Sequence, residues 1–325
     1  MPPEPEITKP PASVRSEVAK FAKEIDKVVP PKRPGRNLLI GTWNLRAFGG
    51  LTKRWDSRPD DSPKRNLRDV RLIAEVVSRF DVVAVQETRG DLRALRHLLK
   101  ALGEEWAFLL TDVTKGPAGN NERLAFLYDT RRVKPSGLAC ELVVWIADSP
   151  QISEAALDRQ FARTPYACSF ATLGANATTF ILVTLHVDWG NKAAERIPEL
   201  KAIAQWLAEW AEDEEEWNHN VIALGDFNIE GDDLFKAFTS TGLSPPAGLA
   251  RVPRTIFDRP EAPHFYDQIA WFDDQKKKVP VLTLTCTGAD SFDFVPELRG
   301  NQTLNTLSWN ISDHYPLFVE FALPQ

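Results

Sequence analysis

Two oxygen-bearing side chains, Asp226 and Asn228, follow directly after the apolar run 221–224. Residues two apart on an extended chain project to the same side, so a strand that ends here delivers a carboxylate and a carboxamide to one point. Hard divalent cations such as Mg²⁺ bind a few oxygen ligands of this kind and keep several waters. Strand–Gly–Asp turns are common, however, so the pair alone indicates either a cation-dependent centre or an ordinary turn.

Further strand-like segments begin or end at a carboxyl, amide or imidazole group. These groups are Asn44 after the run 38–43, Glu87 after 82–86, His186 after 181–185, Asp267 before 269–272, and Asp313 with His314 before the alternation 317–321. Ligands bind where strand ends and loops converge. The distribution therefore predicts that these polar groups meet in one site at the edge of a sheet.

Alternating helical and strand-like segments carry these groups. Apolar residues at helical spacing predict helices over 66–80, 91–102 and 193–217, and further apolar runs predict strands over 123–129, 138–145, 166–173 and 279–287. The acidic run 212–216 is typical of a solvated helix face. This alternation favours a layered α/β fold without internal repeats.

Eight segments resemble the endonuclease/exonuclease/phosphatase superfamily, and within it the deoxyribonuclease I-like group of phosphodiesterases. They are TWNLRAFGG, VVAVQETRGDL, NNERLAFLYD, FARTPY, LVTLHVDWG, ALGDFNIEG, FYDQIAWF and ISDHYPLFVEF, and they occur in the family's order over about residues 37–324. The resemblance implies a four-layer α/β sandwich, with two packed, mixed, mostly antiparallel β-sheets flanked by helices. It also implies metal-dependent hydrolysis of phosphoesters.

The resemblance gives the oxygen-bearing side chains distinct roles. Glu87 is the expected anchor ligand of Mg²⁺ or Mn²⁺, with Asn44 and Asp313 beside it. Such a cation neutralises phosphate charge and stabilises the leaving oxygen. Asp226 and Asn228 either hold or polarise the attacking water or bind a second metal, and the sequence leaves these alternatives open.

The two histidines in these segments, His186 and His314, match the family's catalytic pair. A histidine that handles protons near phosphate needs a carboxylate to set its tautomer and stabilise its cation. By resemblance, Asp267 and Glu122 are the expected partners. The other three histidines lie in segments without such a match, and His264, close to Asp267, is undecided.

Arginines in the same segments point to the substrate. By resemblance, Arg163 in FARTPY holds the scissile phosphate, which its planar fork suits, and Tyr266 is a second phosphate contact. Arg46 and Arg89, each two residues beyond an expected metal ligand, match the deoxyribonuclease branch, and Arg89 matches an arginine that enters the DNA minor groove. The secreted members' paired cysteines and calcium loops have no counterpart here.

Substrate class is the weaker inference. The stretch 46–71 interleaves basic residues with Trp55, which fits contact with nucleic acid, whereas the net charge of −6 does not favour binding by bulk charge. We expect a DNA endonuclease. The alternatives are a phosphatase acting on a phospholipid headgroup, inositol phosphate or nucleotide, and a scaffold whose site is vestigial, which the completely filled set of polar positions disfavours.

The first 36 residues differ from the rest. Proline clusters flank residues 13–29, which have apolar residues at helical spacing. We expect residues 1–36 to form an extension and 37–325 the catalytic domain. The helix either packs on that domain or serves as a partner-binding or inhibitory arm, and because no family motif precedes residue 38, we expect the chemistry not to require it.

Composition suggests the setting of the protein. Its three cysteines, at 140, 168 and 286, show no pairing or metal-binding spacing, which fits a reducing compartment. The N-terminus lacks the apolar stretch of a signal peptide, and no apolar run is long enough to span a membrane. We therefore expect a cytoplasmic protein without a membrane partner, and favour a monomer.

Overall fold

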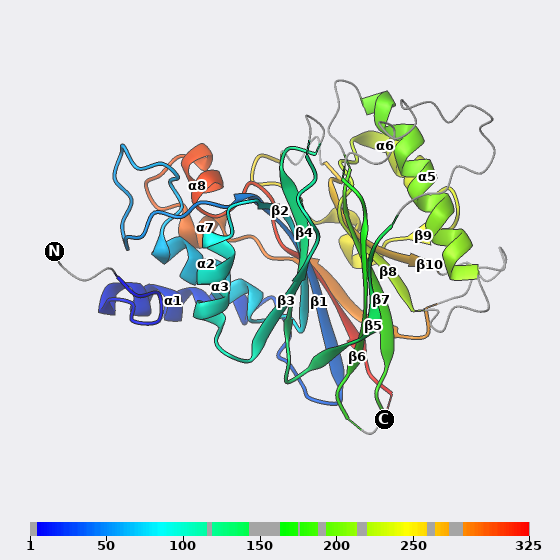
Figure 1. Cartoon of the computed structure of the whole chain (residues 1–325), viewed down its shortest axis with the longest axis horizontal. Helices are drawn as coiled ribbons and strands as arrows, with labels where there is room; N and C mark the ends of the chain where they lie inside the picture. The colour runs from blue at the N-terminus through cyan, green and yellow to red at the C-terminus, as the bar shows by residue number, and fades with distance from the viewer. Residues whose placement is uncertain are drawn as a thin grey trace.

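The structure is a computed structural model that describes residues 5–115, 119–142, 163–174, 176–187, 193–212, 220–258, 264–272 and 282–324. Its helices and strands are arranged in layers (Figure 1). None of the described helices combines the length and apolar character that crossing a membrane requires.

Two six-stranded sheets form the centre of the molecule. The strands of the first sheet are β1 (Asn37–Phe48), β2 (Val82–Arg89), β3 (Trp106–Leu110), β4 (Glu122–Asp129), β11 (Thr285–Ser291) and β12 (Leu317–Ala322), in the order β11-β12-β1-β2-β4-β3. Those of the second are β5 (Val133–Glu141), β6 (Tyr166–Thr172), β7 (Thr179–His186), β8 (Val221–Asp226), β9 (Leu243–Ser244) and β10 (Asp267–Phe272), in the order β5-β6-β7-β8-β10-β9. In each sheet one neighbouring pair, β1–β2 or β7–β8, is parallel, and the other neighbouring strands are antiparallel. The predicted mixed, mostly antiparallel pairing is confirmed.

Helices cover the outer faces of both sheets. On the first sheet lie α1 (Ala12–Ile25), α2 (Leu67–Val77), α3 (Arg93–Leu102), α7 (Val295–Leu298) and α8 (Leu304–Asn310), and on the second α5 (Ala193–Glu212) and α6 (Gly231–Phe238). A 3₁₀ helix spans Ala247–Arg251. The order helices–sheet–sheet–helices is the predicted four-layer α/β sandwich.

Side chains that point alternately to the two faces of each strand explain why four layers form. In β1, Leu38 and Ile40 face the second sheet, whereas Leu39 and Trp43 face the helices, and all four side chains are buried. Successive side chains of a strand point to opposite faces, so a strand that is apolar at every position is covered on both sides. A third apolar layer lies between the second sheet and helices α5 and α6.

The two parallel pairs bring the predicted site residues to one edge. Asn44 lies opposite Gln86, next to Glu87, in the β1–β2 register. His186 lies opposite Asp226 in the β7–β8 register, and antiparallel β10 places Asp267 opposite Asp226 on its other side. Because parallel strands end at the same edge, these groups meet there without any help from long loops.

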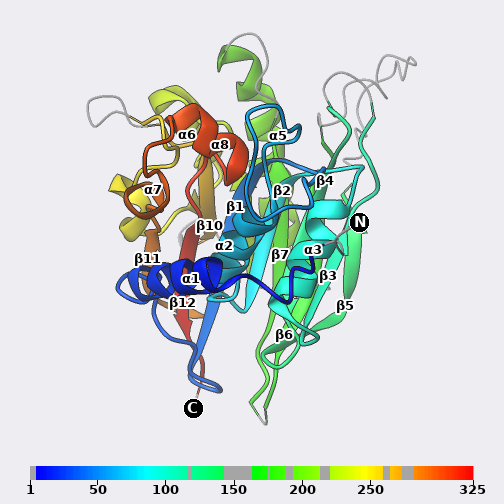
Figure 2. The ribbon, with the colours of Figure 1, turned by 90° about the vertical axis from the view of Figure 1, so that its left-hand side faces the viewer.

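Helix α1 packs against the rest of the molecule and is not a free arm. Its buried residues Val14, Val18, Phe21 and Ile25 belong to the apolar layer between the first sheet and its helices. Helix α1 runs beside α2 (Figure 2), where Glu17 pairs with Arg68 at the start of α2 and Asp26 pairs with Arg79 just beyond its end. The division of the chain at residue 36 into extension and catalytic domain stays a prediction.

Several predicted boundaries shift. The strand predicted over 279–287 begins at Thr285, and the one predicted over 138–145 is β5, whereas residues 143–145, 213–217 and 279–281 lie outside the described residues. The helix predicted over 66–80 is α2, which Asn66 caps by accepting a hydrogen bond from the backbone of Asp69 while the Asp69 carboxylate accepts one from Asn66. Strand β3 and helices α6 and α8 were not predicted.

Candidate active site

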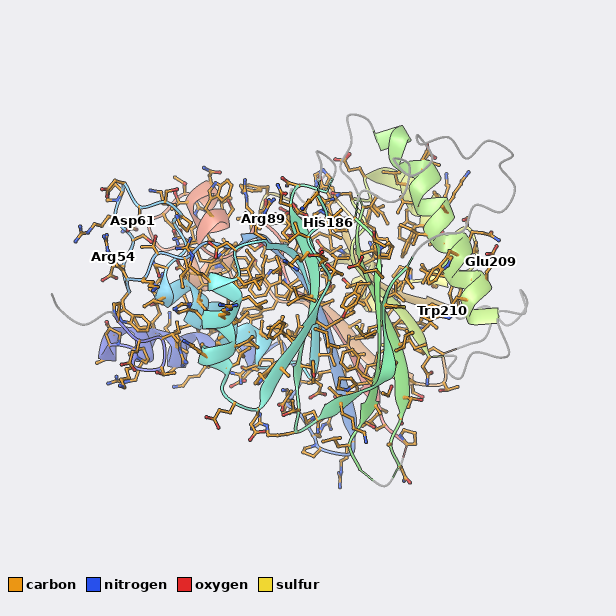
Figure 3. All side chains as sticks on the ribbon, in the orientation of Figure 1. Arg54, Asp61, Arg89, His186, Glu209 and Trp210 are labelled. Carbon is orange, nitrogen blue, oxygen red and sulfur yellow. The ribbon has the colours of Figure 1, made fainter. Side chains whose placement is uncertain are left out.

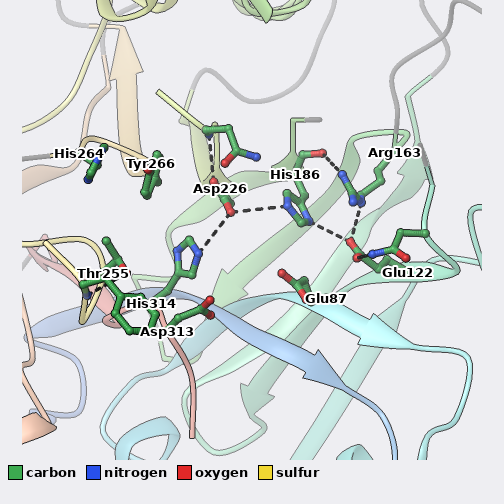
Figure 4. A pocket seen from close by; sticks show the side chains of 13 residues that line it. Glu87, Glu122, Arg163, His186, Asp226, Thr255, His264, Tyr266, Asp313 and His314 are labelled. Atoms are coloured by element: carbon green, nitrogen blue, oxygen red, sulfur yellow. Dashed lines mark hydrogen bonds and ion pairs between the residues drawn. The ribbon is translucent and has the colours of Figure 1, made fainter. Parts of the chain in front are cut away.

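A cleft of about 370 Å³ opens at the shared edge of the two sheets. It is lined by Glu87, Asn120, Glu122, Arg163, His186, Asp226, Asn228, Thr255, Phe257, His264, Tyr266, Asp313 and His314 (Figure 4). Most of the predicted site residues are therefore brought together in one cavity. Asn44 and Asp267 are buried beside it, where Asn44 contacts Asp226 and Asp267 contacts His314.

Asp226 lies at the centre of the cleft and is almost completely buried. Its Oδ2 accepts a hydrogen bond from Asn44 Nδ2 at 3.0 Å, and its Oδ1 accepts one from the backbone N–H of Asn228 at 3.0 Å. The Nε2 atoms of His186 and His314 lie 3.5 and 3.9 Å from Oδ2. Burial alone would raise the pKa of Asp226, but the charges of the two histidines, together with these hydrogen bonds, hold it below its usual value.

Behind Asp226, His314 is paired with a second buried carboxylate. The distance from His314 Nδ1 to Asp267 Oδ2 is 2.6 Å. Burial lowers the pKa of His314, but the Asp267 carboxylate outweighs this and raises that pKa well above its usual value. The Nδ1 contact fixes the ring orientation, so that Nε2 faces Asp226.

On the other side of Asp226, His186 contacts Glu122. His186 Nδ1 lies 3.0 Å from Glu122 Oε2, and Arg163 Nε lies 2.5 Å from the same oxygen. Burial opposes ionisation of Glu122, but hydrogen bonding with His186 and the charges of His186, Arg163 and Arg89 bring its pKa down to about 2. Figure 4 shows the resulting continuous line of contacts from His314 through Asp226 and His186 to Glu122 and Arg163.

The backbone is strained at several of these positions. Glu87 and Asn228 have φ values of 59° and 49°, in the left-handed region that residues other than glycine rarely adopt. Gly225 has φ 139°, and a Cβ there would lie 2.2 Å from the carbonyl oxygen of Leu185. Glycine therefore allows β8 to pass closely beside β7 immediately before Asp226.

The predicted cation ligands suit a hard divalent cation. Among the described residues, Asn44 Oδ1 and Asp313 Oδ1 are buried without a hydrogen-bond partner. Glu87 lines the same cleft and uses Oε2 to accept a hydrogen bond from the backbone N–H of Ala47. Buried unpaired oxygens are costly unless something binds them. An all-oxygen set is the donor type that Mg²⁺ and Mn²⁺ take.

A second cluster of possible ligands is less suited to a cation. One ligand atom from each of Asp226, Asp267 and His314 falls within 4.8 Å of the others. Both ring nitrogens of His314 face carboxylates of this cluster, however. The cluster therefore already contains a positive partner for its negative charges.

Arg46 and Arg89 lie beside the cleft and contact its carboxylates. Arg46 Nη1 is 3.3 Å from Asp313 Oδ2, and Arg89 Nη2 is 3.5 Å from Glu87 Oε2 and 3.3 Å from Glu122 Oε1. The two side chains therefore contact the expected metal ligands Asp313 and Glu87.

Three lining residues have no predicted role. Asn120 Nδ2 donates to Glu122 Oε1 at 2.7 Å, and Thr255 and Phe257 line the wall near His314. Asn120 lies at the start of the segment NNERLAFLYD, which was the available signal for it. The loop residues 255 and 257 lie in no such segment.

The remaining aromatic wall is formed by Tyr266 and His264. Their rings stack at 4.7 Å, and Tyr266 also lines the cleft, where its hydroxyl donates to Glu230 Oε1 at 3.2 Å. His264 Nδ1 lies 2.8 Å from Asp258 Oδ1. His264, undecided from the sequence, thus belongs to the site wall.

Comparison with known proteins gives consistent matches. Residues 41–314 match the family described as Endonuclease/Exonuclease/phosphatase family. A protein named "Deoxyribonuclease" from Thioalkalivibrio sp. (strain K90mix) is 28% identical over 205 residues, which are 62% of this chain and 49% of that protein. Human "Deoxyribonuclease-1" is 26% identical over 197 residues, 59% of this chain and 61% of its own length. The chain thus spans about half to three fifths of these relatives.

Among solved structures, a 2′,3′-cyclic phosphatase superimposes with a TM-score of 0.57 at 13% identity, covering 89% of this chain and 96% of that one. At this level of identity the likeness concerns the fold alone.

Proposed function

The chain belongs to the endonuclease/exonuclease/phosphatase family of hydrolases, and from that premise we propose that it is a DNA endonuclease that depends on Mg²⁺ or Mn²⁺. The observation that supports this most is the single cleft in which Asp226 lies between His186 and His314, beside the oxygen set of Glu87, Asn44 and Asp313. These are the groups that hydrolysis of an anionic diester requires.

In this proposal Asp226 accepts the proton of the attacking water. Its ionised state is held by the neighbouring histidines, and the N–H of Asn228 fixes its orientation. His314, held by Asp267, presents Nε2 to the reacting phosphate as a proton donor. Paired groups whose pKa values are pushed apart are typical of acid and base roles.

His186 and Arg163 would bind the phosphate oxygens from the side opposite His314. Glu122 orients both, because it contacts His186 Nδ1 and Arg163 Nε. A divalent cation held by Asn44, Glu87 and Asp313 would supply neutralisation of phosphate charge and stabilisation of the leaving oxygen. The proposed reaction thus gives tasks to Asp226 with Asn228, to the two histidines with their carboxylate partners, to Arg163 and to the cation set, but none to Tyr266.

The choice of DNA is supported by the relatives named deoxyribonuclease and by the arginines at the rim of the cleft. A phosphatase acting on a small phosphate ester would need only the cleft itself. Nicking of supercoiled plasmid, run beside a phosphate-release screen with Mg²⁺, Mn²⁺, Ca²⁺ or EDTA, separates the two. Release of phosphate from monoesters without plasmid nicking would contradict the endonuclease proposal.

Glu87→Gln and Asp226→Asn test the site directly. Each should reduce plasmid nicking by orders of magnitude, because each group acts as part of a unit, while circular dichroism and the thermal midpoint show a folded protein. Asp233→Asn, an exposed carboxylate on α6, is the matched control and should retain the parent rate. Full activity in excess EDTA, or parent-like turnover by either site variant, would refute the scheme.

Arg46→Ala and Arg89→Ala test DNA contact separately. Since both arginines also neutralise expected cation ligands, rate alone is ambiguous, and the salt dependence of DNA binding is the informative readout. Loss of each phosphate contact should flatten the plot of log affinity against log salt by about 0.9. An unchanged slope in the double variant would place these arginines outside the DNA interface.

A further inference from the structure

A second cleft, of about 610 Å³, lies next to the first on the helical side of the first sheet. It is lined by Ala47, Asp61, Ser62, Pro63, Lys64, Arg65, Asn305, Thr306 and Trp309. Figure 2 shows α8, which carries Trp309, side by side with the loop that follows β1, and Figure 1 agrees. Figure 3 shows Arg54 and Asp61 at the outer end of that loop. The proposed reaction gives this cleft no task.

The aromatic wall of the second cleft is unusually accessible. Trp309 is 43% exposed and belongs to a small set of large hydrophobic side chains that remain exposed among the described residues. An indole left in water gives up the stabilisation that its burial would provide. An exposed indole in the wall of a cleft offers a flat apolar face on which a planar group can stack.

Arg46 connects the two clefts. Its guanidinium lies 4.0 Å from the centre of the Trp309 ring, and its Nη1 is 3.3 Å from Asp313 Oδ2 and 2.6 Å from Ser308 Oγ. One side chain thus spans from the proposed cation site to the indole. A group bound against Trp309 is therefore placed close to the phosphate that the first cleft would cut.

We propose that the second cleft binds a nucleobase of the DNA strand adjacent to the scissile phosphate, with Trp309 as its stacking platform. The inference rests on the proposed function, since it assumes that DNA is the substrate. The inference adds a base-binding subsite to the proposed active site, and this subsite would help to determine which DNA is cut.

The chemistry of the cleft fits a base better than a phosphate. Its wall combines an indole, a proline ring and an alanine methyl with the amide of Asn305 and the hydroxyl of Thr306. Every base has a π-face that stacks on an aromatic ring, and amide and hydroxyl groups can bond its edge. The acidic member, Asp61, is already paired with Arg54 at 3.0 Å.

The basic side chains around the cleft could contact the phosphates of the DNA strand on either side of the bound base. The loop between β1 and α2 carries the basic residues Lys53, Arg54, Arg58 and Lys64, in addition to the buried Arg65. Cations beside an aromatic platform are the pattern of sites that follow a single strand. A base that enters the cleft must leave the duplex stack, which costs least in single-stranded or mismatched DNA. The subsite therefore favours cleavage next to unpaired bases.

Binding of a labelled single-stranded oligonucleotide, measured by fluorescence anisotropy in EDTA so that no cleavage occurs, tests the subsite. Trp309→Ala should weaken binding by about 5- to 150-fold, the range found when an aromatic stacking partner is removed, and Trp309→Phe should recover most of it. Phe108→Ala removes another exposed ring, on edge strand β3, and is the matched control.

The same measurement on oligonucleotides that lack one base shows whether Trp309 contacts a base. The base is removed at one position after another along the oligonucleotide. At one of these positions, loss of the base should weaken binding by the parent protein but should not further weaken binding by Trp309→Ala. Two results would overturn the subsite. One is that every base removal weakens binding by Trp309→Ala as much as binding by the parent, and the other is that Trp309→Ala binds the intact oligonucleotide as tightly as the parent. Turnover with Mg²⁺ on the same DNA separates the outcomes, because a parent that cuts no DNA refutes the proposed function itself.

Discussion

Replacing Arg65 with methionine should destabilise the protein and loosen the proposed cation site together. Arg65 is 2% exposed and bridges two segments of the site. Its Nη atoms donate to the carbonyl oxygens of Arg46 at 2.9 Å, Ala47 at 3.3 Å and Ile311 at 3.0 Å, and its Nε donates to that of Asn310 at 3.1 Å. The first two follow Asn44, and the last two precede Asp313.

The expected cost follows from the acceptors left behind. Methionine fills part of the space of the arginine side chain, but it removes the guanidinium carbon that lies 5.1 Å from the centre of the Phe48 ring. It also leaves four carbonyl oxygens without this donor. Each unsatisfied buried acceptor costs about 1–3 kcal/mol. Part of this cost is offset, because the variant no longer buries a charged guanidinium. Burial of that charge is unfavourable and lowers the pKa of Arg65 to about 10. We expect a net loss of about 3–5 kcal/mol in the free energy of unfolding.

Urea unfolding followed by circular dichroism measures the loss, and Mn²⁺ titration of the folded variant measures the site. Arg65→Lys should be intermediate, since an ammonium has three donors where the guanidinium has five, and Arg299→Met, on the surface, should match the parent. An unchanged urea midpoint in Arg65→Met would refute the bridging role. A lower midpoint with parent-like Mn²⁺ affinity would limit Arg65 to stability.

Two further predictions concern regions away from the cleft. Deletion of residues 1–29 should lower the thermal midpoint, because it uncovers the apolar surface that α1 buries, yet leave Mg²⁺-dependent turnover at low temperature; a folded but inactive product would show that the extension contributes to the site. Burial opposes ionisation of Asp129, but Arg131 and Lys32 bring its pKa down to about 2, below the usual 3.8. The ionised carboxylate therefore stabilises the folded protein above pH ~4, and this contribution disappears as the pH falls through 2. Asp129→Asn should therefore cost about 2 kcal/mol at pH 7 in urea unfolding and much less once the pH is below about 2. A cost that does not change with pH would contradict this assignment.

The apolar runs that end in polar groups were a reliable guide to the core strands. Runs such as 38–43 and 221–224 are buried on both faces and became β1 and β8, so period and length together identified them. Short elements escaped because their patterns are weak. Strand β3 ends in half-buried side chains, and α8 is a short helix that Thr303 caps by accepting a hydrogen bond from the backbone N–H of Thr306.

Directions of side chains were harder to predict than positions. The rule that residues two apart share a face placed Arg46 beyond Asn44 and Arg89 beyond Glu87, as substrate contacts. Ala47 has φ 48° and Glu87 has φ 59°, and the β1–β2 register shifts after Asn44. These local departures from extended geometry, which no residue pattern announces, accompany the turn of both arginines toward neighbouring carboxylates.

The pairing of β1 with β12 has a consequence for synthesis of the chain on the ribosome. Asn37 lies opposite Ala322, and the segment that carries Asp313 and His314 leads into β12, so the earliest and the latest parts of the site are neighbours in one sheet. A growing chain can fold β1 and β2 together, but it lacks two of the proposed catalytic groups until the segment that carries Asp313 and His314 has been translated. Hydrolytic activity should therefore appear only after that segment has been translated, and chains that stop before it should pose no threat to nucleic acid nearby.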